Sequence, residues 1–300
     1  SNVLAGKAWG IPVKGTHAHS WVMAFEDELA SFEAYAQALP NNCIFLVDTY
    51  DSLEGVRRAV QVGQQLRQRG HELAGIRIDS GDLAYLSIQA RKILNEGGFP
   101  KAVVVASNDL DEHLVTSLKQ QGSAIDVWGI GTKLVTGFDQ PALGGVYKLS
   151  ALRRPGGEWE HKLKLSEHAA KATNPGILQV RRFRSKQEFI GDAIYDELQP
   201  PSDHVTIVDP ADPTRRKHFP SGALCEDLLV PVLREGAPVG QMPSLDAIRA
   251  QARHQLSMLH PGLKRLENPH QYPAGLELGL HKRKVQMILH ARGEPQPIHL

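Results

Sequence analysis

Four short apolar runs alternate with amphipathic stretches between residues 44 and 128, and this alternation constrains the fold more than any other feature of the chain. Each run is typical of a buried β-strand, and each stretch after it repeats apolar residues at the spacing of one helical face. Strands that alternate with helices favour a parallel sheet with helices packed outside it. The predicted strands are Ile44–Val47, Gly75–Ile78, Ala102–Val105 and Ile125–Trp128, with a fifth at Val146–Leu149.

The number of strand–helix units predicts an irregular α/β barrel. An apolar segment at Ile11–Val13 precedes the four units and leads through Gly15–Ser20 into a further helix. Five or six units fall short of the eight that close a regular barrel. We therefore expect a barrel that is both irregular and incomplete, with strands absent on its N-terminal side.

The sequence changes character after Leu152, which predicts a second region. Residues 1–152 would form the α/β barrel portion, and residues 153–300 a smaller, mostly β segment with C-terminal helices. Pro- and Gly-rich turns separate the predicted elements of this second region. These elements are short strands at Gln179–Phe183, His204–Val208 and Leu228–Arg234, and an amphipathic helix at Leu245–Leu259 that begins after Ser244.

Charge and cysteine content exclude several classes of protein. Lys and Arg number 34 and Asp and Glu 33, so a net charge of +1 gives no bulk attraction to nucleic acid or an anionic membrane. No apolar stretch approaches the roughly 20 residues of a membrane span. Cys43 and Cys225 are the two cysteines, which excludes a disulfide scaffold and favours a reducing compartment. We expect a cytoplasmic protein that binds neither nucleic acid nor a membrane.

Polar residues follow nearly every predicted strand. Ligands of parallel α/β folds bind at the carboxyl ends of the strands, where the loops converge. A single Asp there is more often the N-cap of the next helix, but five polar ends in succession favour a binding site. The polar ends are Gly15–Ser20, Asp48–Ser52, Asp79–Asp82, Ser107–Asp109 and Gly129–Thr132.

Two of these ends carry groups suited to an anion. Gly129–Thr132 offers free main-chain N–H groups and a hydroxyl to a phosphate monoester, although a tight turn without a ligand explains the glycines equally well. Arg77 and Asp79 are two residues apart on one face of a strand. They form either a structural ion pair or a site in which Arg77 binds a carboxylate or phosphate and Asp79 binds a hydroxyl.

His17 and His19 alternate on a segment predicted to be extended, which would place both rings on one face. A metal pair is one interpretation, but no third ligand is evident. A buried, hydrogen-bonded histidine is the second. A nucleophilic histidine that accepts a group covalently is the third, and the chemistry of the residues alone does not choose among them.

Together these segments resemble the nicotinate phosphoribosyltransferase family over nearly the whole chain. The matching motifs occur in the family's order, so chance similarity of short patterns does not explain them. They are Ser1–Gly6, Gly15–Ser20, Leu46–Asp51, Arg77–Leu83, Ser107–Glu112, Gly129–Thr132, Leu143–Leu149, Leu266–Pro269 and Tyr272–Pro273.

The resemblance implies the fold of a type II phosphoribosyltransferase, an irregular α/β barrel with a mostly β domain, as a homodimer. It implies an enzyme that joins nicotinate to phosphoribosyl pyrophosphate, releasing pyrophosphate and forming nicotinate mononucleotide for NAD salvage. ATP hydrolysis would be coupled to this reaction as a co-substrate step, and Mg²⁺ would accompany the pyrophosphate.

The resemblance also implies residue roles. ATP would phosphorylate His19, whereas His17 ranks below it because that position varies in the family. Arg77 would face the nicotinate carboxylate or a phosphate, and Asp79 the ribose hydroxyls. Asp48, with Asp51 near it, would act through Mg²⁺ and water, and the sequence names no residue that binds the metal directly. The other predicted substrate-binding residues are Ser107, Asn108, Gly129, Gly131 and Thr132, of which the last three would cradle the 5′-phosphate.

Family members continue upstream of residue 1, so we expect this chain to be the C-terminal part of such an enzyme. A nicotinamide or quinolinate phosphoribosyltransferase is the alternative enzyme, although the context of His19 argues against quinolinate. The alternative from another class is a catalytically silent fragment that binds a sugar phosphate or a partner chain.

Overall fold

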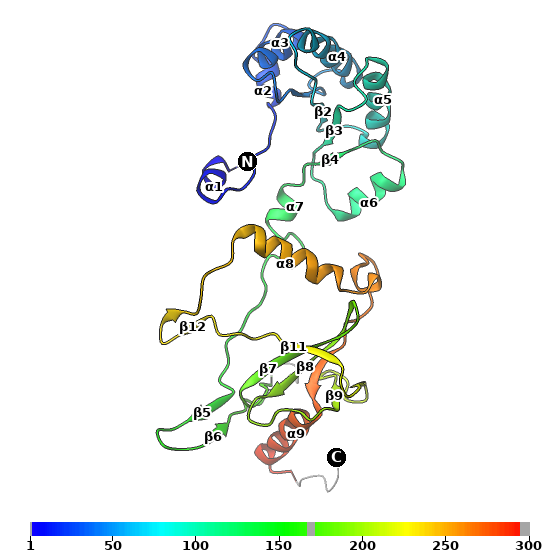
Figure 1. Ribbon diagram of the computed structural model, residues 1–300. Helices are drawn as coiled ribbons and strands as arrows, with labels where there is room; N and C mark the ends of the chain where they lie inside the picture. Colours follow the sequence, from blue (N-terminus) through cyan, green and yellow to red (C-terminus); the bar gives the residue numbers. More distant parts are fainter. Residues whose placement is uncertain (1, 167–171, 295–300) are drawn as a thin grey trace. The chain divides into compact units, whose positions relative to one another are not determined.

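The computed structural model describes residues 2–166 and 172–294 (Figure 1). The chain packs as two compact units, residues 1–144 and residues 145–300. Each unit has its own hydrophobic core and its own sheet. The boundary that the sequence places at residue 152 stays a prediction. In the part of the chain that is described, no helix has the length and apolar content needed to cross a bilayer.

The first unit contains the predicted parallel sheet, with strand order β1-β2-β3-β4. Phe45, Ile76 and Val104 lie side by side on neighbouring strands. The elements are α1 (Val3–Trp9), α2 (His19–Met23), α3 (Glu28–Ala38), β1 (Ile44–Leu46), α4 (Ser52–Gln68), β2 (Gly75–Ile78), α5 (Leu83–Glu96), β3 (Val103–Ala106), α6 (Glu112–Gln120), β4 (Val127–Trp128) and α7 (Thr132–Val135).

Helices cover one face of this sheet. Phe45, Ile76 and Val104 are fully buried on that face, and Phe32 of α3 stacks on Phe45 with ring centroids 4.7 Å apart. Helix α4 lies so close to the sheet that a Cβ on its Gly55 would be 2.2 Å from the Val47 carbonyl oxygen. The close approach explains why this helix position carries no side chain.

The opposite face of the sheet is only half-covered by the described residues. Ile44, Val103 and Val105 are half-buried there, and Val127 is 44% exposed. They line a pocket of about 470 Å³. A parallel sheet is normally buried on both faces, so these strands form the incomplete α/β barrel that the sequence predicts.

Two predicted strands of the first half of the chain are wrong or shortened. Val146–Leu149 forms no strand, and Tyr147 is fully exposed, because no neighbouring strand in the described residues pairs with this apolar run. The predicted strand Ile125–Trp128 is reduced to β4. Beyond it, β5 (Ala151–Arg153) pairs antiparallel with β6 (Trp159–His161).

The described residues of the second unit form a six-stranded sheet, with order β10-β9-β14-β8-β7-β11. Its core includes Phe183 and Phe219, whose rings stack with centroids 4.0 Å apart. Its elements are β7 (Leu178–Ser185), β8 (Glu188–Asp196), β9 (Val205–Val208), β10 (Arg216–Phe219), β11 (Leu224–Asp227), β12 (Leu233–Arg234), β13 (Ala237–Pro238), α8 (Leu245–Ser257), the 3-10 helix η2 (Pro261–Lys264), β14 (Ala274–Glu277) and α9 (Leu278–Arg292).

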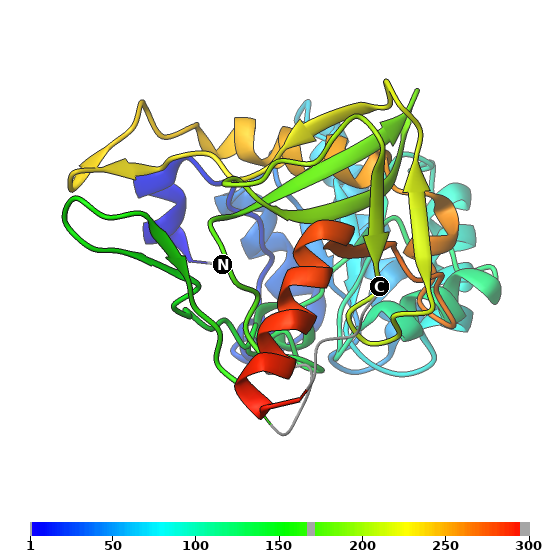
Figure 2. The same ribbon diagram turned by 90° about the horizontal axis from the view of Figure 1, so that it is seen from below.

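The predicted strands at residues 179–183 and 204–208 and the helix after Ser244 are confirmed. The strand predicted at Leu228–Arg234 is wrong over most of its length, because only its last two residues pair, with β13 in a short hairpin. Helix α9 packs across β8, β9 and β14 (Figure 2).

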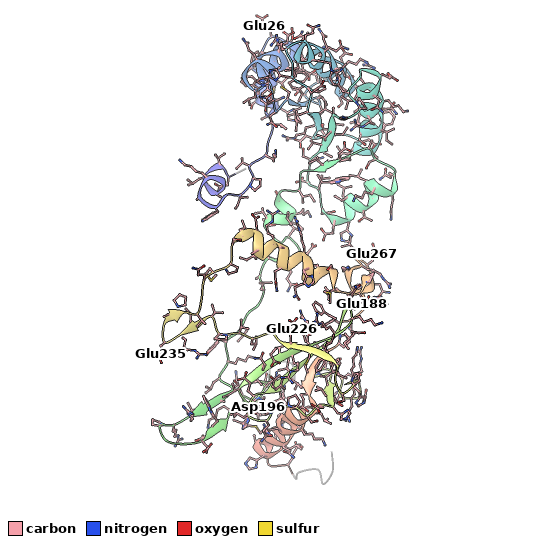
Figure 3. The ribbon with its side chains drawn as sticks, in the orientation of Figure 1. Glu26, Glu188, Asp196, Glu226, Glu235 and Glu267 are labelled. Carbon is pink, nitrogen blue, oxygen red and sulfur yellow. The ribbon has the colours of Figure 1, made fainter. Side chains whose placement is uncertain are left out.

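Asp196 fixes the position of α9 within this second unit (Figure 3). Its side chain is 2% exposed and accepts hydrogen bonds from His161 Nε2 at 2.6 Å and Arg283 Nη1 at 2.8 Å. A Cβ at Gly176 would lie 2.6 Å from Asp196 Cγ, so a glycine is needed beside it. The buried carboxylate is paired with the His161 ring of β6 and the guanidinium of Arg283 on α9, which gives it a structural role.

Candidate functional site

The carboxyl ends of β1, β2 and β3 bring together five of the predicted site residues. They come from segments far apart in the sequence, and the parallel order of the strands places their ends at one edge of the sheet. The five residues are His19, Asp48, Arg77, Asp79 and Ser107.

Ser107 links Arg77 to Asp79. Its Oγ accepts a hydrogen bond from Arg77 Nε at 2.9 Å and donates one to Asp79 Oδ1. Arg77 Nη2 also lies 3.4 Å from Asp79 Oδ2, and Nη1 donates to Thr16 Oγ1 at 2.9 Å. The sequence left open whether Arg77 and Asp79 form a structural ion pair or an anion-binding site, and the structure contains the ion pair. Both side chains keep about a quarter of their surface exposed, so they also remain accessible to a ligand.

His19 faces two carboxylates. Its Nδ1 is 3.0 Å from Thr49 Oγ1, and its Nε2 is 3.9 Å from Asp48 Oδ1 and 3.7 Å from Asp79 Oδ2. The ring is 38% exposed. Because Thr49 engages Nδ1, Nε2 is the ring nitrogen left to react.

Asp48 is held in place by its neighbours. Its side chain is 1% exposed, and Oδ2 accepts hydrogen bonds from the Asp79 N–H at 2.8 Å and from Ser80 Oγ at 2.6 Å. Oδ1, which faces His19, has no hydrogen-bond partner among the residues that the structure describes. A buried carboxylate oxygen without a donor is costly, which is typical of a group positioned for a ligand or a reaction.

Three other aspartates after the strands are helix N-caps, as a single Asp in this position usually is. Asp51, Asp82 and Asp111 accept hydrogen bonds from the main chains of α4, α5 and α6 at 2.8 to 3.0 Å. Among the described residues, Asp51 caps α4 and forms no hydrogen bond or ion pair with the five site residues.

His17 does not share a face with His19, so that expectation is wrong. His19 begins helix α2, whereas His17 is buried before it and accepts a hydrogen bond from the Leu46 N–H at Nε2. The pKa of His17 is lowered to about 4, mainly by burial and to a smaller extent by the positive charge of Arg77. This is the buried, hydrogen-bonded histidine of the second interpretation.

The low pKa of His17 predicts acid sensitivity. The folded pKa of about 4 lies below the ordinary 6.5, so between pH 6.5 and 4 the unfolded chain binds more protons. Stability should therefore fall as pH falls through this window, by up to about 1.4 kcal/mol per pH unit from this group. Denaturant unfolding of His17→Gln should show a flatter pH dependence there than the parent chain.

The control for this prediction is His113→Gln, because His113 is an exposed residue of α6. Glu28 titrates in the opposite sense, since burial raises its pKa to about 7, and its contribution cancels when the two variants are compared. An unchanged slope in His17→Gln would contradict the assignment.

Gly129 follows β4 directly beside Ser107. Its N–H donates to the Ala106 carbonyl at 2.7 Å, and a Cβ there would lie 3.2 Å from Ser107 Cβ. Gly129 also lines the 470 Å³ pocket together with Thr16, Arg77 and Ser107. The pocket therefore extends from the half-covered apolar face of the sheet to the polar cluster.

The remaining residues predicted to bind substrate are Gly131, Thr132 and Asn108. Gly131 precedes α7 and Thr132 begins it, and no contact that the structure gives for the described residues joins either to the cluster. Asn108 follows β3 with φ of 95°, a strained conformation of the kind that concentrates at functional sites. Their substrate-binding roles stay predictions.

The carboxylates of Asp48 and Asp79 suit a Mg²⁺ ion that would be bound by the phosphates of a substrate as well. Mg²⁺ prefers oxygen ligands and usually takes one or two carboxylates beside phosphates and water, and Asp48 Oδ1 is a buried oxygen without a donor. Within the described ranges, no three His, Cys, Asp or Glu side chains converge as a metal cage.

Comparison with known proteins identifies the family. The model of the nicotinate phosphoribosyltransferase family matches residues 1–166, and that of the nicotinate phosphoribosyltransferase C-terminal domain matches residues 179–284. The chain belongs to the nicotinate phosphoribosyltransferase family. It is 42% identical over 293 residues to nicotinate phosphoribosyltransferase of Bacillus subtilis, covering 96% of this chain and 59% of that protein.

This chain is similar to human nicotinate phosphoribosyltransferase in sequence and in structure. The human nicotinate phosphoribosyltransferase is 32% identical over 335 residues, which cover 91% of this chain and 60% of that protein. A crystal structure of human nicotinic acid phosphoribosyltransferase superposes with a TM-score of 0.75 at 26% identity, over 95% of this chain and 63% of that one. The chain thus spans about 60% of the length of the curated relatives.

A more distant structure shares the fold alone. It is nicotinate-nucleotide pyrophosphorylase from Pyrococcus furiosus, with a TM-score of 0.56 and 17% identity over 85% of this chain and 58% of that one.

Three hydroxyl-bearing residues of the site were missed by the sequence analysis. Thr16, Thr49 and Ser80 each hydrogen-bond a predicted site residue. All three lie within motifs that the sequence analysis had matched, so their position in these motifs could have identified them as site residues. The motifs are Gly15–Ser20, Leu46–Asp51 and Arg77–Leu83. Which hydroxyls point into the site depends on the packing of the strands.

Proposed function

We propose that the protein carrying this chain joins nicotinate to phosphoribosyl pyrophosphate, forming nicotinate mononucleotide and pyrophosphate in NAD salvage. The supporting observation is the position of His19 Nε2, 3.7 and 3.9 Å from two carboxylates, at the strand ends that also hold Arg77. ATP is the proposed co-substrate, and the proposed assembly is a cytoplasmic homodimer.

The glycosyl transfer needs positive charge at the ribose to be stabilised. The nicotinate nitrogen forms a bond to the anomeric carbon as the bond from that carbon to the pyrophosphate oxygen breaks. Asp79 is placed to accept hydrogen bonds from ribose hydroxyls, and its fixed charge favours an oxocarbenium-like transition state. Arg77 presents a planar fork to a carboxylate or phosphate. Mg²⁺, when bound, would neutralise the departing pyrophosphate.

His19 is the proposed acceptor of the ATP γ-phosphoryl group. Nε2 attacks phosphorus with its lone pair as the bond from phosphorus to the ADP oxygen breaks, and the ring keeps its proton on Nδ1, where Thr49 Oγ1 can accept a hydrogen bond from it. Water later cleaves the phosphohistidine, which releases phosphate. The added charge of about −2 beside these carboxylates would reorganise the donor site.

A direct assay tests this function. The protein is incubated with ATP, Mg²⁺, phosphoribosyl pyrophosphate and equal nicotinate and nicotinamide. We expect an acid-labile phosphohistidine and nicotinate mononucleotide as the main product. Nicotinamide mononucleotide as the main product would overturn the substrate assignment, and phosphate binding without any product would favour the silent fragment.

Thr49 is the proposed positioning residue for His19. Its hydroxyl can accept a hydrogen bond from Nδ1–H while Nε2 carries the phosphoryl group. Thr49→Val should slow phosphohistidine formation roughly tenfold, as expected for the loss of one such hydrogen bond, and leave the KM for nicotinate unchanged. Thr49→Ser keeps the hydroxyl and should restore the rate. Equal losses in both variants would contradict this role, because the hydroxyl that Thr49→Ser keeps would then fail to restore the rate.

A further inference from the structure

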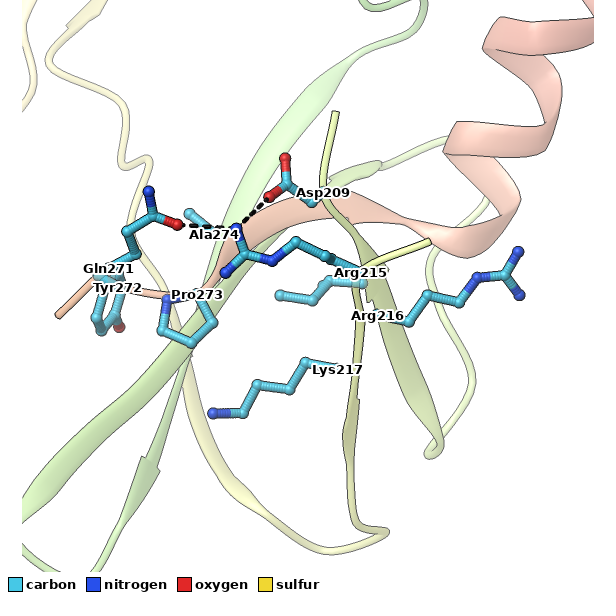
Figure 4. A pocket seen from close by; sticks show the side chains of 9 residues that line it. Asp209, Arg215, Arg216, Lys217, Gln271, Tyr272, Pro273 and Ala274 are labelled. Atoms are coloured by element: carbon cyan, nitrogen blue, oxygen red, sulfur yellow. Dashed lines mark hydrogen bonds and ion pairs between the residues drawn. The ribbon is translucent and has the colours of Figure 1, made fainter. Parts of the chain in front are cut away.

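A separate pocket of about 250 Å³ lies in the second unit (Figure 4). It is formed by the loop that follows β9, by the start of β10 and by the segment that precedes β14. Its polar lining comes from Asp209, Arg215, Arg216, Lys217 and Gln271, and Pro273 gives it an apolar wall. The proposed reaction uses none of these residues.

Arg215 is oriented toward this pocket by two neighbours. Nη1 donates to Gln271 Oε1 at 2.9 Å and lies 3.8 Å from Asp209 Oδ2. Both contacts use the same nitrogen, so Nε and Nη2 keep donors for a ligand. A guanidinium held in place loses less side-chain entropy on binding than a free one.

Lys217 is also held at the pocket. Its Nζ donates to the Ile190 carbonyl oxygen at 2.6 Å, and the ammonium group has two further hydrogens. Lys217 is half-buried, which limits screening of its charge by solvent. Arg216, the residue between them, extends to the other side of the strand (Figure 4), so it adds positive charge to the region without facing the same space.

The pocket therefore has an excess of positive charge. Arg215 and Lys217 contribute two cations against the single carboxylate of Asp209. An arginine fork beside a lysine is the combination that binds phosphate oxygens. A volume of about 250 Å³ lies below the roughly 300 to 1,000 Å³ of sites for drug-sized ligands, so the ligand is a small molecule.

We infer that this pocket binds a phosphate monoester of a small sugar. Arg215 Nε and Nη2 and Lys217 Nζ bind the phosphate, and the Pro273 wall packs against the carbon skeleton. The pocket lies inside residues 179–284, the part matched by the C-terminal domain model, and is separate from the His19 cluster of the first unit. The inference does not depend on the proposed reaction.

Amide chemical shifts of the whole chain test this site, with ribose 5-phosphate as the probe. We expect saturating shifts at the amides of residues 215–217 and 271–274. Binding of the probe to the first unit would shift the amides of residues 79 and 107 instead, so the two binding events can be distinguished. Ribose without phosphate should produce no saturating shift. The double variant Arg215→Gln/Lys217→Gln should weaken binding at least tenfold.

Arg234→Gln is the matched control, because Arg234 is an exposed cation in the β12–β13 hairpin of the same unit. It should bind the probe as the parent chain does. The inference is overturned if sodium chloride at equal ionic strength gives the same shifts, if the shifts do not saturate, or if the double variant, with an unchanged circular dichroism spectrum, binds normally.

Discussion

Replacing His19 with alanine is expected to reduce acid-labile labelling from γ-³²P-ATP to background and to remove the ATP-stimulated part of mononucleotide synthesis. Loss of a covalent nucleophile typically costs several orders of magnitude in the step that it performs. His19 is the exposed histidine whose Nε2 faces both Asp48 and Asp79. The acid-labile radioactivity retained on the protein measures the first effect, and a coupled assay of the mononucleotide product measures the second.

The companion variant is His113→Ala, which removes an exposed histidine from α6 and should retain labelling and synthesis. A His19→Ala protein that still shows ATP-stimulated synthesis at the original rate would refute the assignment of the phosphoryl acceptor. If His19→Ala retains synthesis that ATP no longer stimulates, the result agrees with this assignment, since the proposed glycosyl transfer does not use the imidazole.

Arg77→Ala is expected to weaken binding of nicotinate or of phosphoribosyl pyrophosphate by roughly 10- to 100-fold. The expected loss corresponds to about 1.5–3 kcal/mol for a hydrogen bond to a charged group. The same change removes the donors to Ser107 and Thr16 and leaves Asp79 without its cation. Initial rates with each substrate varied in turn identify which KM rises.

Arg77→Lys separates charge from shape, because lysine keeps the charge but not the planar fork. We expect it to recover only part of the lost affinity. Arg91→Ala serves as the matched control, since Arg91 is on α5 and pairs with Asp126. If Arg77→Ala leaves both substrate affinities unchanged, its role in anion binding is wrong.

The parallel strands of the first unit could be predicted because each is a local pattern. A run such as Gly75–Ile78 is mostly apolar and ends at a turn, and the helix after it has its own capping Asp82. The run Val146–Leu149 has the same local pattern and forms no strand. Pairing needs a neighbour, and a short apolar run does not specify one.

In the second unit, too, local sequence patterns do not specify which strands pair. Strand β14 comes after β8 and β9 by many residues but lies between them, parallel to β8 and antiparallel to β9. Strand β8 was missed because Asp192 and Asp196 interrupt its apolar pattern. Both are buried, paired with Arg182 and with His161 and Arg283, and these partners lie on other elements.

The sequence by itself determined the order of strands and helices in the first unit and the polar character of the strand ends, because hydrophobic periodicity and helix capping act within a few residues. Only the tertiary structure decided which aspartates cap helices and which face His19, since Asp48 and Asp51 occupy the same loop. It also decided that His17 is buried and that Thr49 contacts His19 across 30 residues of chain. Such contacts depend on how separate strand ends meet, and no local pattern encodes that distance.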